Sequence, residues 1–409
     1  MEALEMAFLG RYEWHGKHWQ RRKEEVRPGA VEVPANLWRL ATRDVKALHA
    51  VYTGQRGEFR GQRNPIHRHL GGYQFYYLPR NLFRTYHVLQ SLPWQRHPGG
   101  GIPGGFPGGF PGGWIGEGEP FRVLDLGCGS GAFSLAVLAW LAGLNAAAEA
   151  LPEVQFTLVD QARALTGMAE ANLAAFAARA LPGLRLRIRS HAEGVEGFLN
   201  RSGATRHTLV GAAMMLNELR LLGPRRQSAR APATLDAIRR RAAEGGVILL
   251  VEPGTQQGYL NLMAARDRLA PLPILYPCPH RGPCPLFDPE ASRWCHATLG
   301  LPRGFFFDSR LKGEGGLGFG MSELNMGALA VQAAESGRVA APFVHRKGSR
   351  VVSDALPARP NRRAVPGRAG AGPGQVVLLC TPQGRIDERS REGLRGLFRG
   401  AWLEEPRKG

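Results

Sequence analysis

Three of the five cysteines in this 409-residue chain lie close together in a proline-rich segment. Cys278 and Cys284 belong to "PCPHRGPCPL", and Cys295 follows in "RWCHAT". Where thiols stay reduced, clustered cysteines bind metal more often than they form disulfides. The spacing differs from the Cys-x-x-Cys of a zinc ribbon, but His280 and His296 are further possible zinc ligands. The segment therefore predicts a metal site, either zinc or iron–sulfur, with buried structural cysteines as the alternative.

A glycine-rich turn is the second group of residues with chemical meaning. In "VLDLGCGSG", Gly127, Gly129 and Gly131 stand between an apolar run and an Ala/Leu-rich run. Glycine at such a junction lets the backbone approach a ligand closely. Asp125 is placed to face a cationic amino group, and Asp160 to accept hydrogen bonds from ribose hydroxyls. The pattern resembles the S-adenosylmethionine site of class I methyltransferases, and a turn with only a packing role is the alternative.

The residues after the fourth predicted strand do not identify a methyl-transfer reaction. "MMLNEL" places Asn217 where adenine and cytosine N-methyltransferases carry Asn/Asp-Pro-Pro-aromatic, but the prolines and the aromatic are missing. We assign Asn217 to the cofactor site. RNA cytosine-C5 methyltransferases need a cysteine nucleophile in this region, and no cysteine lies between Cys128 and Cys278. The catalytic residues, and whether the chain is an enzyme, stay open.

The elements that must position these residues alternate between strands and helices. Such alternation implies right-handed crossovers and a mostly parallel sheet. The resemblance of the glycine turn to class I methyltransferases further implies a seven-stranded, Rossmann-like α/β fold of that type. The predicted strands cover residues 121–127, 154–160, 184–190, 207–216 and 245–254, and a helix covers 258–270. Two later runs, 326–332 and 375–380, are interpreted as the sixth and seventh strands.

This fold gives a prediction for a fourth cysteine, Cys380. Class I methyltransferases usually have the strand order 3-2-1-4-5-7-6, with the seventh strand antiparallel. A fifth strand ending near Glu252 and a returning helix would start the cysteine loop at the lower edge of the sheet. A descending seventh strand would bring Cys380 to the same edge. Four cysteines are thus expected to converge opposite the cofactor pocket, which occupies the upper ends of the parallel strands.

The positive charge of the chain is concentrated toward its two ends. Lys and Arg number 53 against 34 Asp and Glu, which leaves +19. Residues 1–100 carry 16 basic and 8 acidic side chains (+8), residues 338–409 carry 15 and 6 (+9), and the middle carries 22 and 20 (+2). Cationic flanks predict a polyanion-binding surface, most simply for nucleic acid, with a generally basic surface as the alternative.

Composition also suggests how the chain is divided. We expect a helical basic module at 1–96, a flexible Pro-Gly linker at 97–120, and a methyltransferase-like domain at 121–409. The domain would contain a cysteine-rich insertion, 271–313, and a basic segment, 338–409. No secretory signal or membrane-length apolar run is recognisable, so a soluble, intracellular monomer without membrane association is expected.

Several segments together resemble one protein family. "VEPGTQQGY", "PCPHRGPCPL", "WCHATL" and "LLCTPQGRI" are similar to the methyltransferase-like assembly factors of the mitochondrial small ribosomal subunit and their bacterial relatives. "YLPRNLFRTYHVL" resembles that family's N-terminal helical segment. This chain departs from the family pattern in the Pro-Gly linker, and it matches the pattern only weakly around "FGMSELNMGALAVQ". The resemblance implies a four-iron–four-sulfur cluster held by Cys278, Cys284, Cys295 and Cys380.

The resemblance also implies a function. It indicates an S-adenosylmethionine-binding protein that associates with small-subunit rRNA or a pre-ribosomal particle, in the bacterial cytoplasm or, in a eukaryote, in mitochondria. One alternative is an active rRNA methyltransferase with the same fold and cofactor. The other is a zinc-stabilised nucleic-acid-binding protein with a vestigial cofactor pocket.

Overall fold

The computed structural model describes most of the region between residues 119 and 333 and shorter parts on either side of it. The described residues are 12–15, 18–21, 36–53, 69–92, 119–144, 151–201, 205–219, 222–223, 226–227, 231–269, 272–278, 280, 282–284, 286, 294–300, 308–318, 323–333, 349–351, 356–357, 375–380, 386–390 and 402–403. The predicted linker at 97–120 lies almost entirely outside them, and of the basic segment at 338–409 only five short strands are described.

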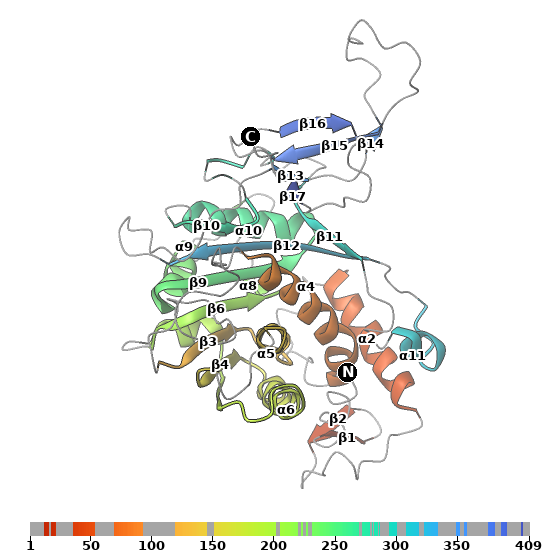
Figure 1. Cartoon of the computed structure of the whole chain (residues 1–409). Coiled ribbons are helices and arrows are strands. Elements are labelled where there is room, and N and C mark those ends of the chain that lie inside the picture. The colour runs from red at the N-terminus through yellow and green to blue at the C-terminus, as the bar shows by residue number, and fades with distance from the viewer. Residues whose placement is uncertain are drawn as a thin grey trace, which may run out of the picture.

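An eight-stranded sheet forms the centre of the molecule (Figure 1). Its order is β10-β12-β9-β6-β3-β4-β5, and β11 pairs with the free part of β12. The central strands are parallel, whereas β12 runs antiparallel to β9 and β10. The strands are β3 (Phe121–Leu126), β4 (Val154–Asp160), β5 (Leu186–Ala192), β6 (His207–Ala213), β9 (Ala242–Pro253), β10 (Ile274–Tyr276), β11 (Ala297–Gly300) and β12 (Glu323–Gln332).

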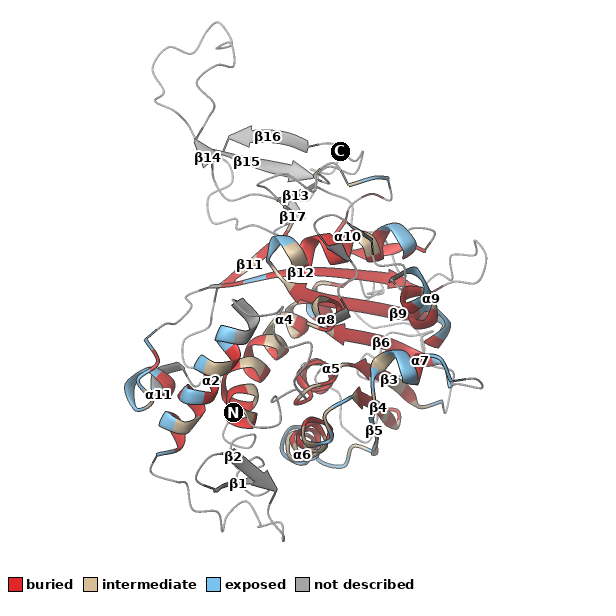
Figure 2. Cartoon of the chain, turned by 180° about the vertical axis from the view of Figure 1, so that it is seen from behind, coloured by how far each residue is buried: buried red, intermediate tan, exposed pale blue. Residues whose placement is uncertain are grey.

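Helices cover both faces of this sheet, because the central strands are apolar on both sides (Figure 2). On one face, Val123 and Phe156 pack in a cluster with Leu135 of α5. On the other, Leu124 and Val210 pack with residues of α9 and α10. The covering helices are α4 (Leu78–Ser91), α5 (Ala132–Ala142) and α6 (Arg163–Ala180) on the first face, and α7 (Val195–Leu199), α8 (Leu216–Leu219), α9 (Ala231–Arg241) and α10 (Gln256–Leu269) on the second.

The N-terminal helices pack directly against the sheet domain. They are α2 (Leu37–Thr53), α3 (Leu70–Gly72), the π-helical turn η4 (Tyr73–Tyr77) and α4. Helix α4 shares the apolar cluster of α5, while α2 and η4 form a third cluster with α6 and α11 (Asp308–Gly313). The N-terminal helices therefore belong to the same packed body as the glycine turn between β3 and α5.

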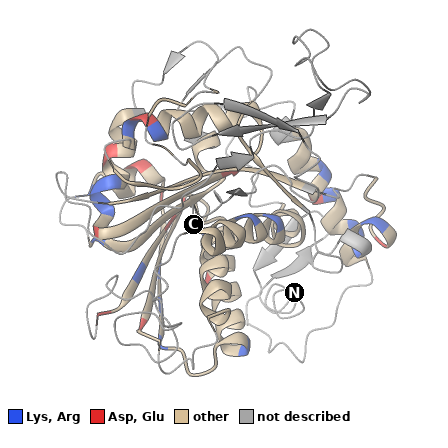
Figure 3. Ribbon diagram, turned by 45° about the horizontal axis from the view of Figure 1, so that its top comes forward, with Lys and Arg blue, Asp and Glu red and all other residues tan. Residues whose placement is uncertain are grey.

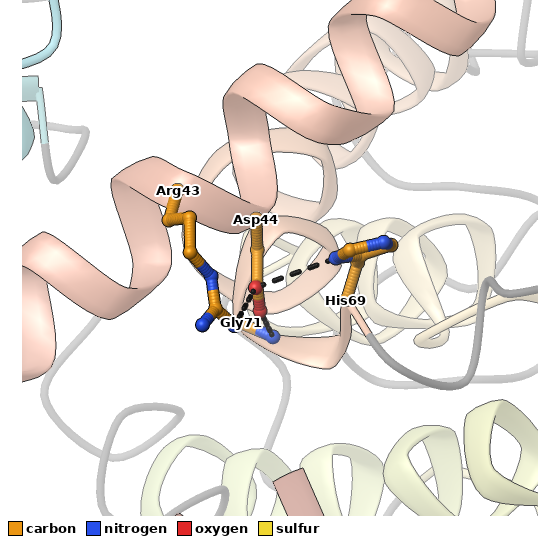
Figure 4. Close-up of polar contacts among 4 residues, drawn as sticks. All are labelled: Arg43, Asp44, His69 and Gly71. Carbon is orange, nitrogen blue, oxygen red and sulfur yellow. Dashed lines mark hydrogen bonds and ion pairs between the residues drawn. The ribbon is translucent and has the colours of Figure 1, made fainter. Parts of the chain in front are cut away.

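A buried carboxylate joins the first two of these helices (Figure 4). Asp44 of α2 is fully buried, and its Oδ2 accepts a hydrogen bond from the backbone N–H of Gly71 at 3.2 Å. Its Oδ1 lies 3.1 Å from the Arg43 guanidinium and 3.4 Å from His69 Nδ1. A buried carboxylate is tolerated only when its oxygens are paired, so these contacts hold the start of α3 against α2.

Two of the predicted strand assignments were wrong. Residues 326–332 belong to β12, which is antiparallel to β9 and takes the place expected for the seventh strand. The sixth strand is β10, which is parallel to β9. It has three residues between prolines, and so short a run gives no recognisable strand pattern. The 375–380 run lies outside the main sheet altogether.

That run forms part of a second, antiparallel sheet. Strand β15 (Gln375–Cys380) pairs there with its neighbours in a five-stranded arrangement. The others are β13 (Ser349–Val351), β14 (Leu356–Pro357), β16 (Ile386–Ser390) and β17 (Trp402–Leu403). Two short hairpins complete the description, β1 (Tyr12–His15) with β2 (His18–Arg21) and β7 (Leu222–Gly223) with β8 (Arg226–Gln227). Within the described residues, no helix is long and apolar enough to cross a membrane.

Candidate cofactor site and cysteine cluster

The glycine turn joins β3 to α5 and has the backbone that only glycine adopts easily. Gly127, Gly129 and Gly131 have φ angles of 68°, 51° and 91°. A Cβ on Gly131 would lie 3.0 Å from the Ala169 side chain, whereas one on Gly129 would meet nothing within 4 Å. Gly131 is thus needed for close packing onto α6, and Gly129 borders open space at the carboxyl ends of the strands.

Two aspartates brace this turn. Asp160, at the end of β4, accepts hydrogen bonds from the backbone N–H of Gly129 at 3.0 Å and of Ala162 at 2.8 Å. Asp125, in β3, is fully buried, and its Oδ2 accepts hydrogen bonds from Ser134 through both the hydroxyl (2.7 Å) and the backbone N–H (3.2 Å). Both carboxylates therefore fix the shape of the turn before any ligand binds.

Burial changes the protonation of these groups. It raises the pKa of Asp125 to about 7, against the two hydrogen bonds from Ser134 that lower it. Burial also raises the pKa of Asp160, and it raises the pKa of the Cys128 thiol well above its usual range. Cys128 is therefore a protonated, buried thiol and is not an activated nucleophile.

The polar groups and the open space at the glycine turn suit a nucleoside cofactor. Oδ1 of Asp125 is buried and has no hydrogen-bond partner among the described residues. The Asp160 carboxylate has lone pairs left after its two backbone contacts, and the space beside Gly129 is open. These groups suit a ligand that carries hydroxyls and a cationic amine, because Asp125 and Asp160 have acceptor lone pairs free and the backbone at Gly129 can be approached closely.

Asn217 lies in α8, one residue after Leu216 and at the carboxyl end of β6. Its side-chain oxygen accepts a hydrogen bond from Asn261 of α10 at 3.1 Å. The backbone N–H of Leu216 donates to the fully buried carboxylate of Glu252 at 2.8 Å. Asn261 and Glu252 were not singled out from the sequence, because each residue type is common and only the crossover brings them together.

A strained residue precedes Asn217. Met214 has a φ of 64°, which is unusual for a residue with a side chain. Its backbone N–H donates to Val251 of β9 at 2.7 Å. Backbone strain of this kind concentrates at functional sites, and this one lies on the same edge of the sheet as the glycine turn. No pattern in the sequence indicated it.

The N-terminal helices contact the turn through a pair of buried amides. Gln74 of η4 and Asn172 of α6 exchange two hydrogen bonds, each 2.9 Å long. Asn172 also donates to the backbone carbonyl of Ser130 within the turn, at 2.9 Å. Both amides are almost completely buried. Gln74 therefore positions the glycine turn indirectly, through Asn172.

The cysteine loop lies at the carboxyl edge of the sheet, so its predicted position at the opposite edge was wrong. Cys278 follows β10, which is parallel to β9 and ends at the same edge. The Trp294 indole donates to the carbonyl of Gly254, just after β9, at 2.9 Å. The glycine turn follows β3, four strand positions from β10, which corresponds to roughly 19 Å along the edge.

Helix α10 holds this loop. The Tyr259 hydroxyl lies 3.6 Å from the Cys284 sulfur. Arg266, with a side chain only 1% exposed, donates to the backbone carbonyl of Gly282. Cys278 is buried, and Cys284 and Cys295 are partly buried against the same apolar cluster. The three thiols therefore lie beside α10, near Tyr259.

An unpaired imidazole lies in the same loop, close to Arg266. His280 is 7% exposed, and neither ring nitrogen has a hydrogen-bond partner among the described residues. Burial raises the pKa of the Cys278 thiol to about 11, although the Arg266 guanidinium opposes this, and it raises the pKa of Cys284. Soft sulfur donors, with an unpaired buried imidazole in the same loop, are of the chemical type that a thiophilic metal group requires. Across the described residues, however, no three His, Cys, Asp or Glu side chains are arranged to hold an ion.

Cys380 ends β15, in the second sheet. Its backbone pairs with Arg350 of β13 and Ile386 of β16. Its side chain lies outside the described residues, so its convergence with the other three sulfurs stays a prediction.

The strand order, read from β5, is 3-2-1-4-5-7-6 with the seventh strand antiparallel, and this defines a class I methyltransferase fold. Residues 119–305 match the family model of the mitochondrial small ribosomal subunit protein Rsm22. The family resemblance is thereby confirmed over somewhat less than half of the chain, including the glycine turn and the cysteine loop.

The chain is also similar to solved structures of methyltransferases, at low sequence identity. The CurJ carbon methyltransferase is 14% identical, with 81% of this chain and 78% of that chain covered and a TM-score of 0.36. The arsenic(III) S-adenosylmethionine methyltransferase CrArsM from Chlamydomonas reinhardtii is 15% identical, with 66% and 77% covered and a TM-score of 0.28. No curated protein matches the sequence.

Proposed function

We propose that this protein binds S-adenosylmethionine, associates with small-subunit rRNA, and assists assembly of the small ribosomal subunit. The observation that carries the proposal is the match of residues 119–305 to a small-ribosomal-subunit family, because it spans both candidate sites. The fold alone would not suffice, since one fold supports many functions. The family name also favours the mitochondrial alternative over the bacterial cytoplasm.

The cofactor would bind at the glycine turn. The open space beside Gly129 accommodates a close approach to the backbone, and Asp160 is the acceptor for ribose hydroxyls. Asp125, with one buried oxygen unpaired, is the partner for the amino group. S-adenosylmethionine would supply an electrophilic methyl group. Asn217 is held by Asn261 at the edge of the same site, which makes it a positioning group for the cofactor.

The metal group would bind at the cysteine loop. Cys278, Cys284 and Cys295 converge beside α10, and the family resemblance supplies Cys380 as the fourth ligand. The proposed group is a four-iron–four-sulfur cluster, which would join the loop to the second sheet. Its role is structural, because metal binding to a proline-rich loop contributes folding free energy.

A zinc site is the second candidate for this loop, and His280 is the observation that favours it. An imidazole that is buried without a partner is a suitable fourth ligand for a three-cysteine zinc site. In this alternative, Cys380 would take no part. Metal analysis of the wild-type protein and of the His280→Ala variant separates the two, because only zinc binding would depend on the imidazole.

Two binding measurements test the proposed function. Calorimetry with S-adenosylmethionine should show binding, and small-subunit rRNA transcripts should bind more weakly as salt rises. Incubation of the rRNA with methyl-labelled cofactor then tests the catalytic alternative, which the strained Met214 favours. Absence of both cofactor and rRNA binding would contradict the proposal, and label transfer would establish an enzyme.

A further inference from the structure

Exposed arginines form a belt along one corner of the described body, away from both candidate sites. Strand β5 is the outermost strand of the sheet, and its sequence alternates arginine with other residues. Alternate residues of a strand project to the same side, about 6.6 Å apart. The belt comprises Arg185, Arg187 and Arg189 on or beside β5, Arg201 after α7, and Arg239 and Arg240 at the end of α9, all of them exposed.

The β5 part and the α9 part of the belt are linked by Arg201, which affects ionisable groups on both sides. Arg189 and Arg201 both lower the pKa of His191, after the larger effect of burial. Arg201 and Arg240 likewise lower the pKa of Arg241, again after burial. Arg241 itself is buried and donates to the carbonyls of Phe198 and Leu199, so it anchors α9 to α7 beneath the belt.

Acidic side chains neutralise only part of this charge. Arg187 pairs with Glu153 at 2.6 Å, and Arg201 pairs with Glu193 at 2.7 Å. Within the described residues, the other four belt arginines form no ion pair. Figure 3 shows Lys and Arg along the outer strands and the neighbouring helix ends of the described part.

A recess gives the belt a concave end. It has a volume of about 300 Å³ and lies where α9 meets β9. Arg206, Arg239 and Arg240 line it, together with Asp236 and Glu244. Arginine guanidinium groups in a recess are well suited to phosphate, because their N–H donors match its oxygens in pairs.

We propose that the arginine belt is an RNA-binding surface that tracks the phosphate backbone. A regular row of cations suits a regular row of anions, and guanidinium groups read phosphates without reading sequence. Protection of the edge strand against pairing with another chain would need charge of either sign, but not a belt that continues around α7 to α9. This inference rests on the proposed rRNA binding and places it on the body of the protein, in addition to the cationic flanks.

The test uses full-length protein, small-subunit rRNA transcripts and a salt titration. Arg185→Glu/Arg189→Glu and Arg239→Glu/Arg240→Glu are compared with Arg310→Glu/Lys312→Glu, an equal charge change at two exposed positions on α11, outside the belt and the cationic flanks. Glutamate keeps the edge strand charged, so unwanted strand pairing is not introduced. Thermal melting and S-adenosylmethionine calorimetry verify that each variant is folded.

Each belt variant should bind rRNA at least about tenfold more weakly, with a log–log salt slope smaller by about 2, since each phosphate contact contributes roughly 0.7 to 0.9. The control should change affinity less than about threefold. Belt variants that bind like the control, while the wild type binds rRNA, would overturn this inference and leave the proposed function intact. A wild type that binds no rRNA would overturn both. Displacement of rRNA by polyglutamate at equal charge would assign the belt to acidic proteins instead.

Discussion

The glycine turn and the cysteine loop lie at the same edge of the sheet but are held in different ways. The turn has partners within the protein for its backbone: Asp160 for Gly129 and Asn172 for Ser130. The cysteine loop has apolar packing and contacts from α10, but its imidazole at His280 is unpaired and its Cys278 thiol is protonated at neutral pH. The turn is thus formed before its ligand binds, whereas the proposed function makes the cysteine loop dependent on a bound metal group.

Replacing a cysteine of the loop should have the largest effect on metal content and stability, and it tests the difference between the loop and the turn directly. Cys278→Ser should reduce metal per chain by at least about tenfold and lower the melting temperature, since an oxygen replaces a soft ligand. Cys128→Ser is the matched control, because Cys128 is equally buried but belongs to the glycine turn. Metal analysis and thermal melting after anaerobic purification make the comparison. Equal metal loss in both variants would show that metal binding is not specific to the cysteine loop.

Substitution in the turn should separate cofactor binding from stability. Gly129→Ala adds a methyl group to open space at a cost of about 1–2 kcal/mol of backbone strain, and should abolish S-adenosylmethionine binding. Gly131→Ala adds similar strain and also contacts Ala169, so it should lose about 1–3 kcal/mol more stability. Denaturant unfolding and calorimetry measure both effects. A Gly129→Ala protein that binds the cofactor normally would refute the placement of the site.

The buried carboxyl of Asp125 should make stability depend on pH. Because its folded pKa is raised to about 7, the folded state holds a proton that the unfolded state releases at a pKa near 3.8. Stability should therefore fall as pH rises from about 4 to 7, by at most roughly 4 kcal/mol from this group. Asp125→Asn should flatten that fall. Urea unfolding at several pH values measures it, and an unchanged profile would show that Asp125 is not the titrating group.

The contact between the N-terminal helices and the turn should give the smallest effect. Gln74→Ala leaves Asn172 partly unpaired and should cost about 1–3 kcal/mol of stability. The shifted Asn172 should weaken cofactor binding by only a few fold, since Gln74 acts indirectly. Gln155→Ala, which removes a contact to Glu153 on a partly buried strand position, is the control. Identical cofactor affinity in the two variants would show that the amide pair has only a packing role.

Much of the fold was predictable because its signals are local. The five parallel strands and the glycine turn each carry a continuous run of apolar or glycine residues, and all were found within a few residues of their bounds. The sixth strand was missed because β10 contains only three residues between prolines. That omission shifted the later strands by one position, and so placed the cysteine loop at the wrong edge.

The finer parts of the site depend on long-range contacts that no local pattern contains. Gln74 and Asn172 are separated by 98 residues, and Asn217 and Asn261 by 44. The arginine belt was also hidden, because residues 101–337 are nearly neutral when counted along the chain. Only folding separates the arginines of β5 and α9 from the acidic residues that balance them in the count.

The central claim is that the cysteine loop is completed by a metal group, and the most direct test is the content of iron, acid-labile sulfide and zinc in full-length protein purified without oxygen. The proposed cluster predicts about four iron atoms and about four sulfides per chain, in a brown protein. One zinc per chain without iron or sulfide would instead support the site that includes His280. A protein that folds and binds rRNA with none of the three elements would contradict the claim.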